Sequence, residues 1–480
     1  MTTGSLVPLC VDLDGTLVRT DMLHEAILTL AKSSPISLLK LPHWLAEGKA
    51  KFKTTVAAHA TPDPKHLPYN EDVLALINQA RSEGRTIVLA TAAPSQVARA
   101  IADDLGYFDD VICTDEIVNL SGQSKADALN THFGERGYDY VGNHRHDLPI
   151  FSQARRAYLV SSSVRLRRSA ERANDAITFI DNPPAGIAVW LRALRVHQWM
   201  KNGLIFVPLL AAQKVDDVAL LLAAFLAFVS FSVCASTVYI LNDLLDLAAD
   251  RAHRSKYRRP FASGAISVSS GIIAVPFLLL AALSIALLLP KLFLFVLVGY
   301  AIATTAYSFV LKRQVIVDVM VLAGLYTIRI LAGSAATSIV PSFWLLAFSM
   351  FLFLCLAMVK RYSELSLAVD RQELLVGRGY MASDLPVILT LGASSGMVSA
   401  LVLALYTQSP IIQEHFLTPQ WLWLLPPLML YWISRLWLKA SRGEVDDDPV
   451  VFAAKDWQSL LIVSLMGLAF LLGGAGWWPL

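Results

Sequence analysis

Residues 218–241 are uncharged and run directly into the acidic stretch Asn242-Asp243-Leu-Leu-Asp246-Leu-Ala-Ala-Asp250. About 20 consecutive apolar residues are enough for a helix to cross the hydrocarbon core of a membrane. If the helix continues into the acidic stretch, Asp243, Asp246 and Asp250 are spaced i, i+3 and i+7 and share one face. Like charges at this spacing repel, so helix stability alone does not explain them.

The bilayer restricts where these acids can lie. An Asp at the centre of a membrane costs roughly 2.5–3.5 kcal/mol, so three that face lipid are implausible. We expect them to face a water-accessible cavity at the cytoplasmic edge, although a solvated acidic loop balanced by nearby arginines is the alternative. Hard oxygen ligands select magnesium, which also binds substrate phosphates. The predicted metal ligands are Asn242, Asp243, Asp246 and Asp250, with Asp243 and Asp246 central to catalysis.

The chain divides sharply in composition. Up to about residue 182 charged and apolar residues are mixed, as in a globular domain, whereas long apolar runs follow from about 186. We predict a first domain over 1–180, a linker over 181–190 with paired prolines, and an all-α membrane domain over 191–480. Its roughly nine crossings are predicted near 198–213, 218–241, 267–289, 292–310, 315–336, 342–359, 385–407, 419–438 and 457–477.

Basic residues gather in alternate loops of the membrane part. The intervening loops hold only Lys214 and Lys291. The positive-inside rule therefore places the basic loops, the acidic stretch and the first domain in the cytoplasm, with Leu480 on the far side. This is the topology of a multi-pass protein of a bacterial-type inner membrane. The basic loop residues are Arg251, Arg254, Lys256, Arg258, Arg259, Lys312, Arg313, Lys360, Arg361, Arg371, Arg378, Arg435, Lys439 and Arg442.

Composition bounds the remaining possibilities. The net charge of +2 says little about partners, and we expect no nucleic acid among them. Residues 1–9 lack the pattern of a secretory signal. The four cysteines are scattered, without the paired spacing of a zinc site or a disulfide framework.

Three short apolar runs in the first domain, 8–11, 86–90 and 138–141, each precede a polar motif. They read as buried strands, with helical patterns between them at 70–82 and 96–105. Strands that alternate with helices predict a parallel sheet, whose ligands bind beyond the carboxyl ends of the strands. We therefore expect the polar motifs to meet at one edge of the sheet.

The motifs follow a definite order: Asp12-Leu-Asp14-Gly15-Thr16-Leu17, then Thr91, then Lys125, then Gly142-Asn-His-Arg-His-Asp147. A single Asp-x-Asp-Gly can be a turn, but the ordered set is far more specific. It resembles the haloacid dehalogenase-like hydrolase superfamily over nearly all of 6–160. The resemblance implies a Rossmann-like α/β domain in which Asp12 attacks phosphorus to form an aspartyl-phosphate. Asp14 would act as the acid and base for the leaving group.

The same resemblance assigns the other polar groups. It implies that Thr91 and Lys125 hold the phosphoryl oxygens, and that Asp12 and Asp147 help to hold magnesium. Where the family usually has an acid, this chain has Asn143, whose amide oxygen can ligate a hard cation but brings no charge. The domain is therefore either a working phosphatase or a degenerate, regulatory or docking domain. Residues from about 21 to 68 would form a small helical cap that restricts substrate size.

Basic residues follow the acidic stretch at once, in Lys256-Tyr-Arg258-Arg259-Pro260-Phe-Ala-Ser-Gly264. Cations beside a metal cluster make a phosphate site of both signs. The pattern N-D-x-x-D-x-x-x-D-R, followed by K-x-x-R-P and S-G, resembles the UbiA superfamily of intramembrane prenyltransferases over roughly 190–480. The resemblance implies a nine-helix fold in which magnesium neutralises a leaving pyrophosphate. Lys256 and Arg259 would stabilise the developing charge.

Three further runs look like the polyprenyl-phosphate phosphoribosyltransferase branch, which joins the ribose of phosphoribosyl pyrophosphate to a polyprenyl phosphate. They are Leu194-Arg-Val-His-Gln198-Trp-Met-Lys201-Asn202, Tyr307-Ser-Phe-Val-Leu311-Lys312 and Lys360-Arg361-Tyr-Ser-Glu364-Leu. Aromatic prenyltransferases usually carry a second Asp-x-x-x-Asp motif. Residues 360–378 lack this motif and have Lys360, Arg361, Glu364 and Asp370 instead. For Tyr307 and Lys312, and for Asp318 nearby, membrane-interface anchoring is the alternative. The predicted phosphate-binding residues here are Lys201, Lys256, Arg259, Tyr307, Lys312, Lys360 and Arg361.

The functional hypotheses differ in the substrates that the protein would use. In the favoured one, a polyprenyl phosphate attacks phosphoribosyl pyrophosphate, and the fused phosphatase has a phosphorylated product nearby. The alternative is an aromatic prenyltransferase, similar to 4-hydroxybenzoate polyprenyltransferases, that uses a polyprenyl pyrophosphate and carries a non-catalytic first domain. A membrane transporter is the third hypothesis, although the sequence shows no internal repeat.

Three more polar features carry expectations. Arg329 lies in an apolar helix and is expected to face inward, because an unpaired charge in a membrane is costly. Glu444-Val-Asp446-Asp447-Asp448 is expected to be a solvated connector. The end of the first domain is basic, and its arginines either form a solvated face or contact anionic lipid headgroups. They are Arg155, Arg156, Arg165, Arg167, Arg168 and Arg172.

Overall fold

A computed structural model describes residues 6–115, 119–370, 379–410, 412, 416–445 and 448–475 of the chain. The chain folds into two compact units. The sheet unit is Met1–Arg195 with Tyr239–Phe277, and the helical unit is Val196–Val238 with Leu278–Leu480. Some residues used in the predictions lie outside the described residues: Arg371, Arg378, Asp446, Asp447, Leu480 and the side chain of Asp370.

A six-stranded sheet forms the centre of the sheet unit, in the order β3-β2-β1-β4-β5-β6. All five pairings are parallel, which confirms the predicted α/β class. The three strands predicted from the sequence are neighbours at its centre, so the motifs that follow them come together. The strands are β1 (Leu9–Val11), β2 (Ile87–Pro94), β3 (Asp110–Thr114), β4 (Asp139–Gly142), β5 (Arg156–Val160) and β6 (Ile177–Ile180).

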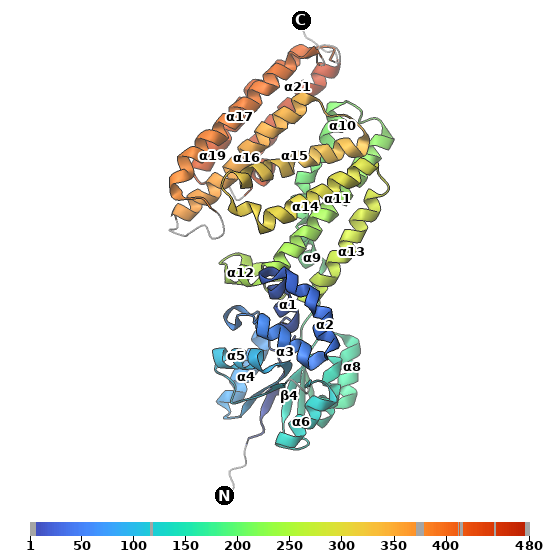
Figure 1. Cartoon of the computed structure of the whole chain (residues 1–480), viewed down its shortest axis with the longest axis vertical. Helices are drawn as coiled ribbons and strands as arrows, with labels where there is room; N and C mark the ends of the chain where they lie inside the picture. Colours follow the sequence, from blue (N-terminus) through green and yellow to red (C-terminus); the bar gives the residue numbers. More distant parts are fainter. Residues whose placement is uncertain are drawn as a thin grey trace. The chain divides into compact units, whose positions relative to one another are not determined.

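Alternate residues of the central strands face opposite sides of the sheet. Leu9 and Val11 pack in one hydrophobic core and Cys10 in the other, as a strand covered on both faces requires. Helices α4 and α5 contribute to the first core, and α6, α7 and α8 contribute to the second; Figure 1 shows them flanking the strands. Their bounds are α4 (Glu71–Ser82), α5 (Ser95–Leu105), α6 (Gln123–Phe133), α7 (Leu148–Gln153) and α8 (Val164–Ala173).

A small helical cap lies in sequence between β1 and α4, as predicted. Asp21 begins its first helix, because the Asp21 side chain accepts hydrogen bonds from the N–H groups of Leu23 and His24. The cap helices are α1 (Met22–Ser33), α2 (Leu41–Ala46) and α3 (Lys49–His59), with short 3-10 helices at Pro35–Lys40 and Pro64–His66.

Three details of this unit differ from the sequence predictions. Strand β2 continues through Thr91, because β3 pairs with it as far as Pro94. The outer strands β3, β5 and β6 were not predicted, since exposed residues such as Asp110 and Arg156 interrupt their apolar pattern. Residues 181–186 are irregular, but α9 (Ile187–Ala193) begins inside the range predicted as a linker.

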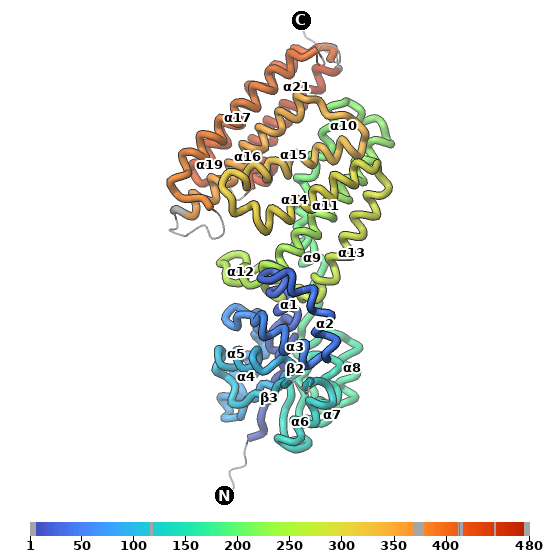
Figure 2. The backbone as a smooth tube through the Cα atoms, in the orientation of Figure 1, coloured from blue at the N-terminus to red at the C-terminus, as the bar shows by residue number. Residues whose placement is uncertain are grey.

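Seven helices in the described part of the chain are long and apolar enough to cross a membrane. Within the helical unit, α16, α17 and α19 (Leu425–Ser441) lie side by side (Figure 2). The seven are α11 (Val218–Leu245), α13 (Val268–Ala286), α14 (Lys291–Phe309), α15 (Val317–Thr337), α16 (Phe343–Asp370), α17 (Leu385–Thr407) and α21 (Trp457–Ala475).

Two of the nine predicted crossings are interrupted. Residues 198–213 form a 3-10 helix, Val196–Phe206, followed by the short α10 (Val207–Ala211). Residues 419–438 form a 3-10 helix, Pro419–Leu424, before α19 begins. Each break coincides with a proline in the first turn of the following helix, where the missing N–H does no harm. The all-α prediction is confirmed, whereas the count of nine is not.

Candidate active site

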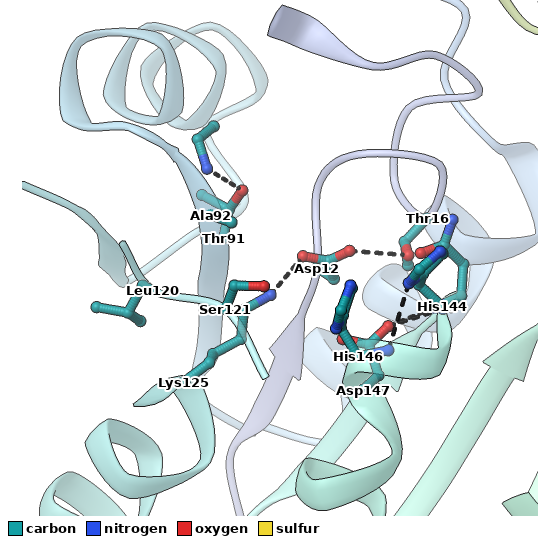
Figure 3. Close-up of polar contacts among 12 residues, drawn as sticks. Asp12, Thr16, Thr91, Ala92, Leu120, Ser121, Lys125, His144, His146 and Asp147 are labelled. Carbon is teal, nitrogen blue, oxygen red and sulfur yellow. Dashed lines mark hydrogen bonds and ion pairs between the residues drawn. The ribbon is translucent and has the colours of Figure 1, made fainter. Parts of the chain in front are cut away.

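Asp12 lies at the carboxyl end of β1, where its N–H donates to the Val141 carbonyl of β4 at 3.0 Å. The buried carboxylate accepts hydrogen bonds from Lys125 Nζ at 2.7 Å and from the Thr16 hydroxyl at 3.3 Å (Figure 3). Burial raises the pKa of Asp12, and the Lys125 ammonium opposes that rise. The structure thus brings Asp12 and Lys125 together, 113 residues apart in sequence.

Asp14 is half-buried, and its Oδ1 accepts a hydrogen bond from the N–H of Met22, the first residue of α1, at 2.8 Å. Burial raises the pKa of Asp14 to about 7, and the Asp21 carboxylate adds to the rise. A carboxyl that titrates near neutral pH can both donate and accept a proton. This environment suits the acid and base role predicted for Asp14.

Gly15 permits the turn that separates Asp12 from the cap. Its φ is +73°, and a Cβ there would lie 2.1 Å from Nδ2 of Asn143. A side chain at position 15 would therefore be strained and would also collide with that amide. Asn143, which replaces the acid usual in the family, lies directly against the loop that carries Asp14.

Asp147 is buried and accepts three hydrogen bonds. Its Oδ2 accepts the N–H groups of Asn143 and His144 at 3.0 and 2.9 Å. Its Oδ1 accepts the Tyr140 hydroxyl at 3.1 Å, and the same hydroxyl accepts a hydrogen bond from Lys125 Nζ at 3.1 Å. A continuous network therefore joins Asp147 to the Asp12–Lys125 pair.

Thr91 lies on the neighbouring strand β2, and a lysine of the cap contacts that strand. The buried Thr91 hydroxyl accepts a hydrogen bond from the N–H of Ala93 at 3.0 Å. Lys53 of α3 donates to the Ala92 carbonyl at 2.8 Å and to Asn119 Oδ1 at 3.1 Å. Burial lowers the pKa of Lys53. Lys53 was not predicted from the sequence, because no fixed spacing links a cap residue to the motifs of the sheet.

A cavity of about 650 Å³ within the sheet unit is lined by Asp12, Asp14, Lys53, Lys125, Asn143 and Asp147, whereas Thr91 is not among its lining residues. Carboxylate and amide oxygens are hard donors, so Asp12, Asp147 and Asn143 fit the magnesium that the resemblance implies. Across the described residues, however, no three Asp, Glu, His or Cys side chains are grouped as a metal site. Lys125 neutralises Asp12 in this arrangement instead.

The acidic stretch lies at the end of α11. The buried Asp243 Oδ1 accepts hydrogen bonds from Arg195 Nη2 at 2.6 Å and from Arg259 Nη1 at 3.0 Å. The same Arg259 nitrogen lies 2.7 Å from Asp250 Oδ2. Asp243 and Asp250 therefore face one guanidinium group. Arg195 was not assigned from the sequence, where its only signal was its place in the run 194–202.

The expected continuous helix is interrupted at Asp246. Helix α11 ends at Leu245, and α12 (Leu247–Ala252) begins after Asp246, whose φ and ψ are −100° and 12°. The Asp246 carboxylate pairs with Lys32 Nζ of the cap at 2.6 Å. A single face of three carboxylates was therefore the wrong expectation: Lys32 holds Asp246, whereas Arg259 pairs with both Asp243 and Asp250 and relieves their mutual repulsion.

The remaining predicted residues of this stretch are more open. Asn242 is half-buried beside Asp243, and Lys256 is exposed. The oxygen donors of the stretch suit a hard divalent cation by their chemistry. In the present arrangement a cationic side chain holds each of the three carboxylates, namely Arg195, Arg259 or Lys32.

A buried ion pair ties the cap to the segment after the acidic stretch. Arg251 Nη1 and Nη2 donate to the two carboxylate oxygens of Glu25 at 2.7 and 2.6 Å, and both side chains are 5% exposed. Arg251 Nε also donates to the Ala262 carbonyl at 3.0 Å. This pair was not predicted from the sequence, because 226 residues separate its members.

We predict that Arg251→Ala destabilises the protein by about 3–5 kcal/mol, because it leaves the Glu25 charge buried and unpaired. Thermal unfolding in detergent should show the loss as a lower midpoint temperature. Glu25→Ala should cost a similar amount, and the double variant should cost less than the sum of the two. Arg254→Ala is the exposed control and should leave the midpoint unchanged. Strict additivity of Arg251→Ala and Glu25→Ala would contradict the prediction.

In the helical unit, two of the predicted phosphate-binding residues share one acid. Asp448 forms an ion pair with Lys201 and lies 3.9 Å from Lys360 Nζ. The Asp448 side chain is only 12% exposed, so the expectation of a solvated connector is wrong for this residue. It holds for Glu444, which is exposed and pairs with Lys439 at 3.0 Å. Asp448 also begins α20 (Pro449–Lys455) as its N-cap.

Arg361 is fully buried in the same unit. Its Nη2 lies 2.6 Å from Asp318 Oδ2, and its Nη1 pairs with Glu364. Asp318 is thus held in an internal ion pair, and the anchoring alternative does not apply to it. Tyr307 on α14 and Lys312 in the following turn are both partly buried.

Arg329 faces inward, as predicted. It is 5% exposed, and its Nε donates to Asn202 Oδ1 at 2.8 Å. Its guanidinium lies over three aromatic rings, which stabilise a cation through their faces. The rings are those of Phe231, Tyr300 and Tyr326, at 5.5, 5.3 and 5.6 Å.

Comparison with known families covers both parts of the chain. Residues 204–457 match the model of the UbiA prenyltransferase family, which is more than half of the 480 residues. The chain belongs to the UbiA prenyltransferase family. Residues 9–152 match the model of haloacid dehalogenase-like hydrolases, so this UbiA-family protein carries a hydrolase-like domain in the same chain. Both resemblances predicted from the sequence are confirmed.

One relative of this UbiA-family protein is similar over both domains, and others are similar over part of the chain. The uncharacterised protein y4nM of Sinorhizobium fredii is 38% identical over 97% of this chain and 91% of its own length, so the similarity runs through both domains. Nodulation protein NoeC of Azorhizobium caulinodans is 34% identical over 59% of this chain and 93% of its own. A decaprenyl-phosphate phosphoribosyltransferase of Mycobacterium tuberculosis is 38% identical over 39% of this chain and 64% of its own.

Family and helix content together define the class of protein. The seven apolar helices and the membership of the UbiA family make it a multi-pass membrane protein. It is a transferase with an added hydrolase-like domain. The predicted class of enzyme is thereby confirmed.

Proposed function

We propose that this UbiA-family protein uses magnesium to transfer a phosphoribosyl group from phosphoribosyl pyrophosphate to a polyprenyl phosphate. The observation that carries the proposal is the buried pair Asp243 and Asp250, joined by Arg259 and flanked by Arg195. When substrate binds, these acids can hold the metal ion, and the guanidinium groups can hold the pyrophosphate. The similarity to decaprenyl-phosphate phosphoribosyltransferases supports the choice of substrate, as does the missing second acidic motif over 360–378.

The reaction makes one bond and breaks one. An oxygen of the lipid phosphate bonds to the anomeric carbon of the ribose, and the bond from that carbon to the pyrophosphate oxygen breaks. Asn242, Asp243, Asp246 and Asp250 would hold magnesium, which supplies positive charge against the leaving pyrophosphate when it is bound. Arg195 and Arg259 then turn from the acids to the pyrophosphate oxygens, as guanidinium groups readily do. Lys256, being exposed, adds a third cation.

Lys201 and Lys360 are the strongest candidates of the helical unit for binding an anion. They share the single carboxylate of Asp448, so the three groups keep an excess positive charge inside the unit. A lipid phosphate would balance it. Tyr307, Lys312 and Arg361 are weaker candidates, and Arg361 already has two acids, Asp318 and Glu364, as partners.

The hydrolase-like domain would be a magnesium-dependent phosphatase. Support comes from the meeting of Asp12, Asp14, Lys125 and Asp147 around one cavity. Asp12 attacks phosphorus, and Asp14 gives a proton to the leaving oxygen. Water then cleaves the aspartyl-phosphate while Asp14 takes up its proton, and Thr91 and Lys125 stabilise the phosphoryl oxygens.

The proposed location is the inner membrane, with the hydrolase-like domain and the acidic stretch in the cytoplasm. The cluster of basic residues from Arg251 to Arg259 supports this orientation. Phosphoribosyl pyrophosphate is highly charged, so its binding site must open to water.

Membranes that contain the protein test the proposed transfer directly. One arm offers labelled phosphoribosyl pyrophosphate with polyprenyl phosphate, and the other offers labelled 4-hydroxybenzoate with polyprenyl pyrophosphate. The proposal expects label in the lipid fraction of the first arm only, and only with magnesium. Label confined to the second arm would establish an aromatic prenyltransferase instead.

Asn143 offers a separate test of the phosphatase. We predict that Asn143→Asp lowers the magnesium concentration for half-maximal hydrolysis of p-nitrophenyl phosphate roughly tenfold, because a carboxylate adds charge where the amide has none. Gln79→Glu, at an exposed position on α4 outside the cavity, is the matched control and should change nothing. An unchanged magnesium dependence for Asn143→Asp would remove this residue from the metal site.

A further inference from the structure

Part of the lining of the cavity around Asp12 lies outside the residues that match the hydrolase model. Besides the catalytic acids, Trp190 of α9 and residues 264–267, 269 and 270 line it, and we call these residues the wall. The hydrolase match ends at residue 152, and the later segment falls within the transferase match, 204–457. All of these residues belong to the sheet unit, so the wall is part of one compact body.

The wall is packed closely against the catalytic loop and the cap. Gly264 has a φ of +72°, and a Cβ there would lie 2.8 Å from the Arg19 Cβ. The Ser269 hydroxyl and the His24 ring of the cap share a hydrogen bond of 3.2 Å. Trp190 packs edge-on against Phe261, with their ring centroids 6.5 Å apart. A ligand at Asp12 therefore meets this wall.

The cavity carries polar groups that lack partners. Arg19 Nε and the Thr20 hydroxyl are buried and have no hydrogen-bond partner among the described residues, and Arg19 and Thr20 both line the cavity. A buried donor without an acceptor is costly, so a ligand with several oxygens would stabilise the site. Pro183, Trp190 and Ile266 provide apolar surface in the same cavity. The lining as a whole suits an amphipathic phosphate ester.

The wall also lies at one end of a membrane-crossing helix. Helix α13 begins at Val268, and Ser267, Ser269 and Ser270 around that first turn line the cavity. Helix α13 begins inside the sheet unit and is long and apolar enough to cross a membrane, so the cavity adjoins the first turn of a candidate membrane helix. Lipid headgroups lie where a crossing helix leaves the bilayer, so a membrane-anchored phosphate is the kind of ligand that suits this position.

From these observations we infer that the phosphatase substrate is a lipid-anchored phosphomonoester, namely the phosphate that the transferred ribose carries. This identity of the headgroup rests on the proposed transferase function. Asp12 Oδ bonds to phosphorus and the ester P–O bond breaks, with the sugar oxygen taking a proton from Asp14. Water then cleaves the aspartyl-phosphate, which leaves a lipid-linked ribose and inorganic phosphate.

Purified full-length protein and chemically made substrates test this inference independently of the transferase. Polyprenyl-phosphoryl ribose 5-phosphate in mixed micelles is compared with ribose 5-phosphate in the same micelles. We expect a kcat/KM at least about a hundredfold higher for the lipid-linked ester, because binding energy from the remote part of a substrate favours its reaction. Equal values for the two esters would overturn the inference.

A substitution in the wall tests whether the wall binds the lipid-linked ester. Ala265 is exposed and lines the cavity, so Ala265→Trp should narrow it without disturbing a core. We expect the ratio of kcat/KM for the lipid-linked ester to kcat/KM for p-nitrophenyl phosphate to fall roughly tenfold, because the larger ester makes more contacts with the wall. Ala176→Trp, exposed and outside the cavity, is the control. An equal loss of both activities, or of neither, in Ala265→Trp would contradict the role of the wall. If the supplied lipid ester is hydrolysed but no ribose is transferred, only the proposed transferase function fails.

Discussion

The Asp243→Asn variant is expected to transfer phosphoribosyl groups to lipid at least about a hundredfold more slowly than the wild type, because loss of one charge-stabilising group costs this much. Asp243 is 3% exposed and lies against two guanidinium groups. The amide keeps the shape of the side chain but removes the negative charge, so the site loses both a metal ligand and the counterion of Arg195 and Arg259. The initial rate of label incorporation into the lipid fraction measures the effect.

Two controls separate this loss from misfolding. Asp216→Asn changes an exposed acid just before the same helix and should leave the transfer rate unchanged. Asp243→Asn itself should still hydrolyse p-nitrophenyl phosphate at the wild-type rate, since Asp12 is untouched. A transfer rate within about threefold of wild type would show that Asp243 lies outside the reacting site.

The Asp12→Asn variant is expected to lose hydrolysis of phosphate esters by at least about a thousandfold, as removal of a nucleophile does in other enzymes. Asp12 is the carboxylate that Lys125 and Thr16 orient at the carboxyl end of β1. An amide cannot form the aspartyl-phosphate. The phosphoribosyl transfer of this variant should remain within about twofold of wild type, because the acidic stretch is unchanged.

Asp103→Asn, which alters an exposed acid on α5, is the matched control and should keep both activities. Release of inorganic phosphate from p-nitrophenyl phosphate gives the rate. Full hydrolysis by Asp12→Asn would show that the domain does not use this nucleophile. Absence of hydrolysis in the wild type as well would leave a binding role for the domain.

The sequence predicted the centre of the sheet well, for a physical reason. Buried parallel strands must be apolar throughout, so 8–11, 86–90 and 138–141 stand out from their surroundings. Each also precedes a motif, and adjacent parallel strands bring those motifs to one edge. Asp12 and Asp147 came together as a result, and Lys125 reaches Asp12 from α6. The edge strand β3 and strand β5 escaped prediction because they carry exposed charges such as Asp110 and Arg156.

The pairing of charges could not be predicted in the same way. Glu25 and Arg251, Lys32 and Asp246, and Lys201 and Asp448 are more than 200 residues apart in sequence. No local periodicity records such pairs. The break at Asp246 could not be predicted for a related reason, because Lys32, which pairs with Asp246, is distant in the sequence, whereas Asp243 and Asp250 share Arg259.

The helical part shows how well apolar composition predicts helices that can cross a membrane. Long apolar runs identified the seven helices that can cross a membrane. Two further runs, 198–213 and 419–438, are interrupted just before prolines in the first turns of α10 and α19. Hydropathy averages over such breaks and therefore overestimated the continuity of these two segments.

One doubly labelled incubation tests the proposed coupling of transfer and hydrolysis most directly. Phosphoribosyl pyrophosphate labelled both in the ribose carbons and in the 5-phosphate is given to purified protein with polyprenyl phosphate and magnesium. We predict ribose label in the lipid and the 5-phosphate label in inorganic phosphate for the wild type. We predict both labels in the lipid for Asp12→Asn, and neither label in the lipid for Asp243→Asn. Wild-type lipid that contains no ribose label, or that keeps both labels in equal amounts, would contradict this coupling.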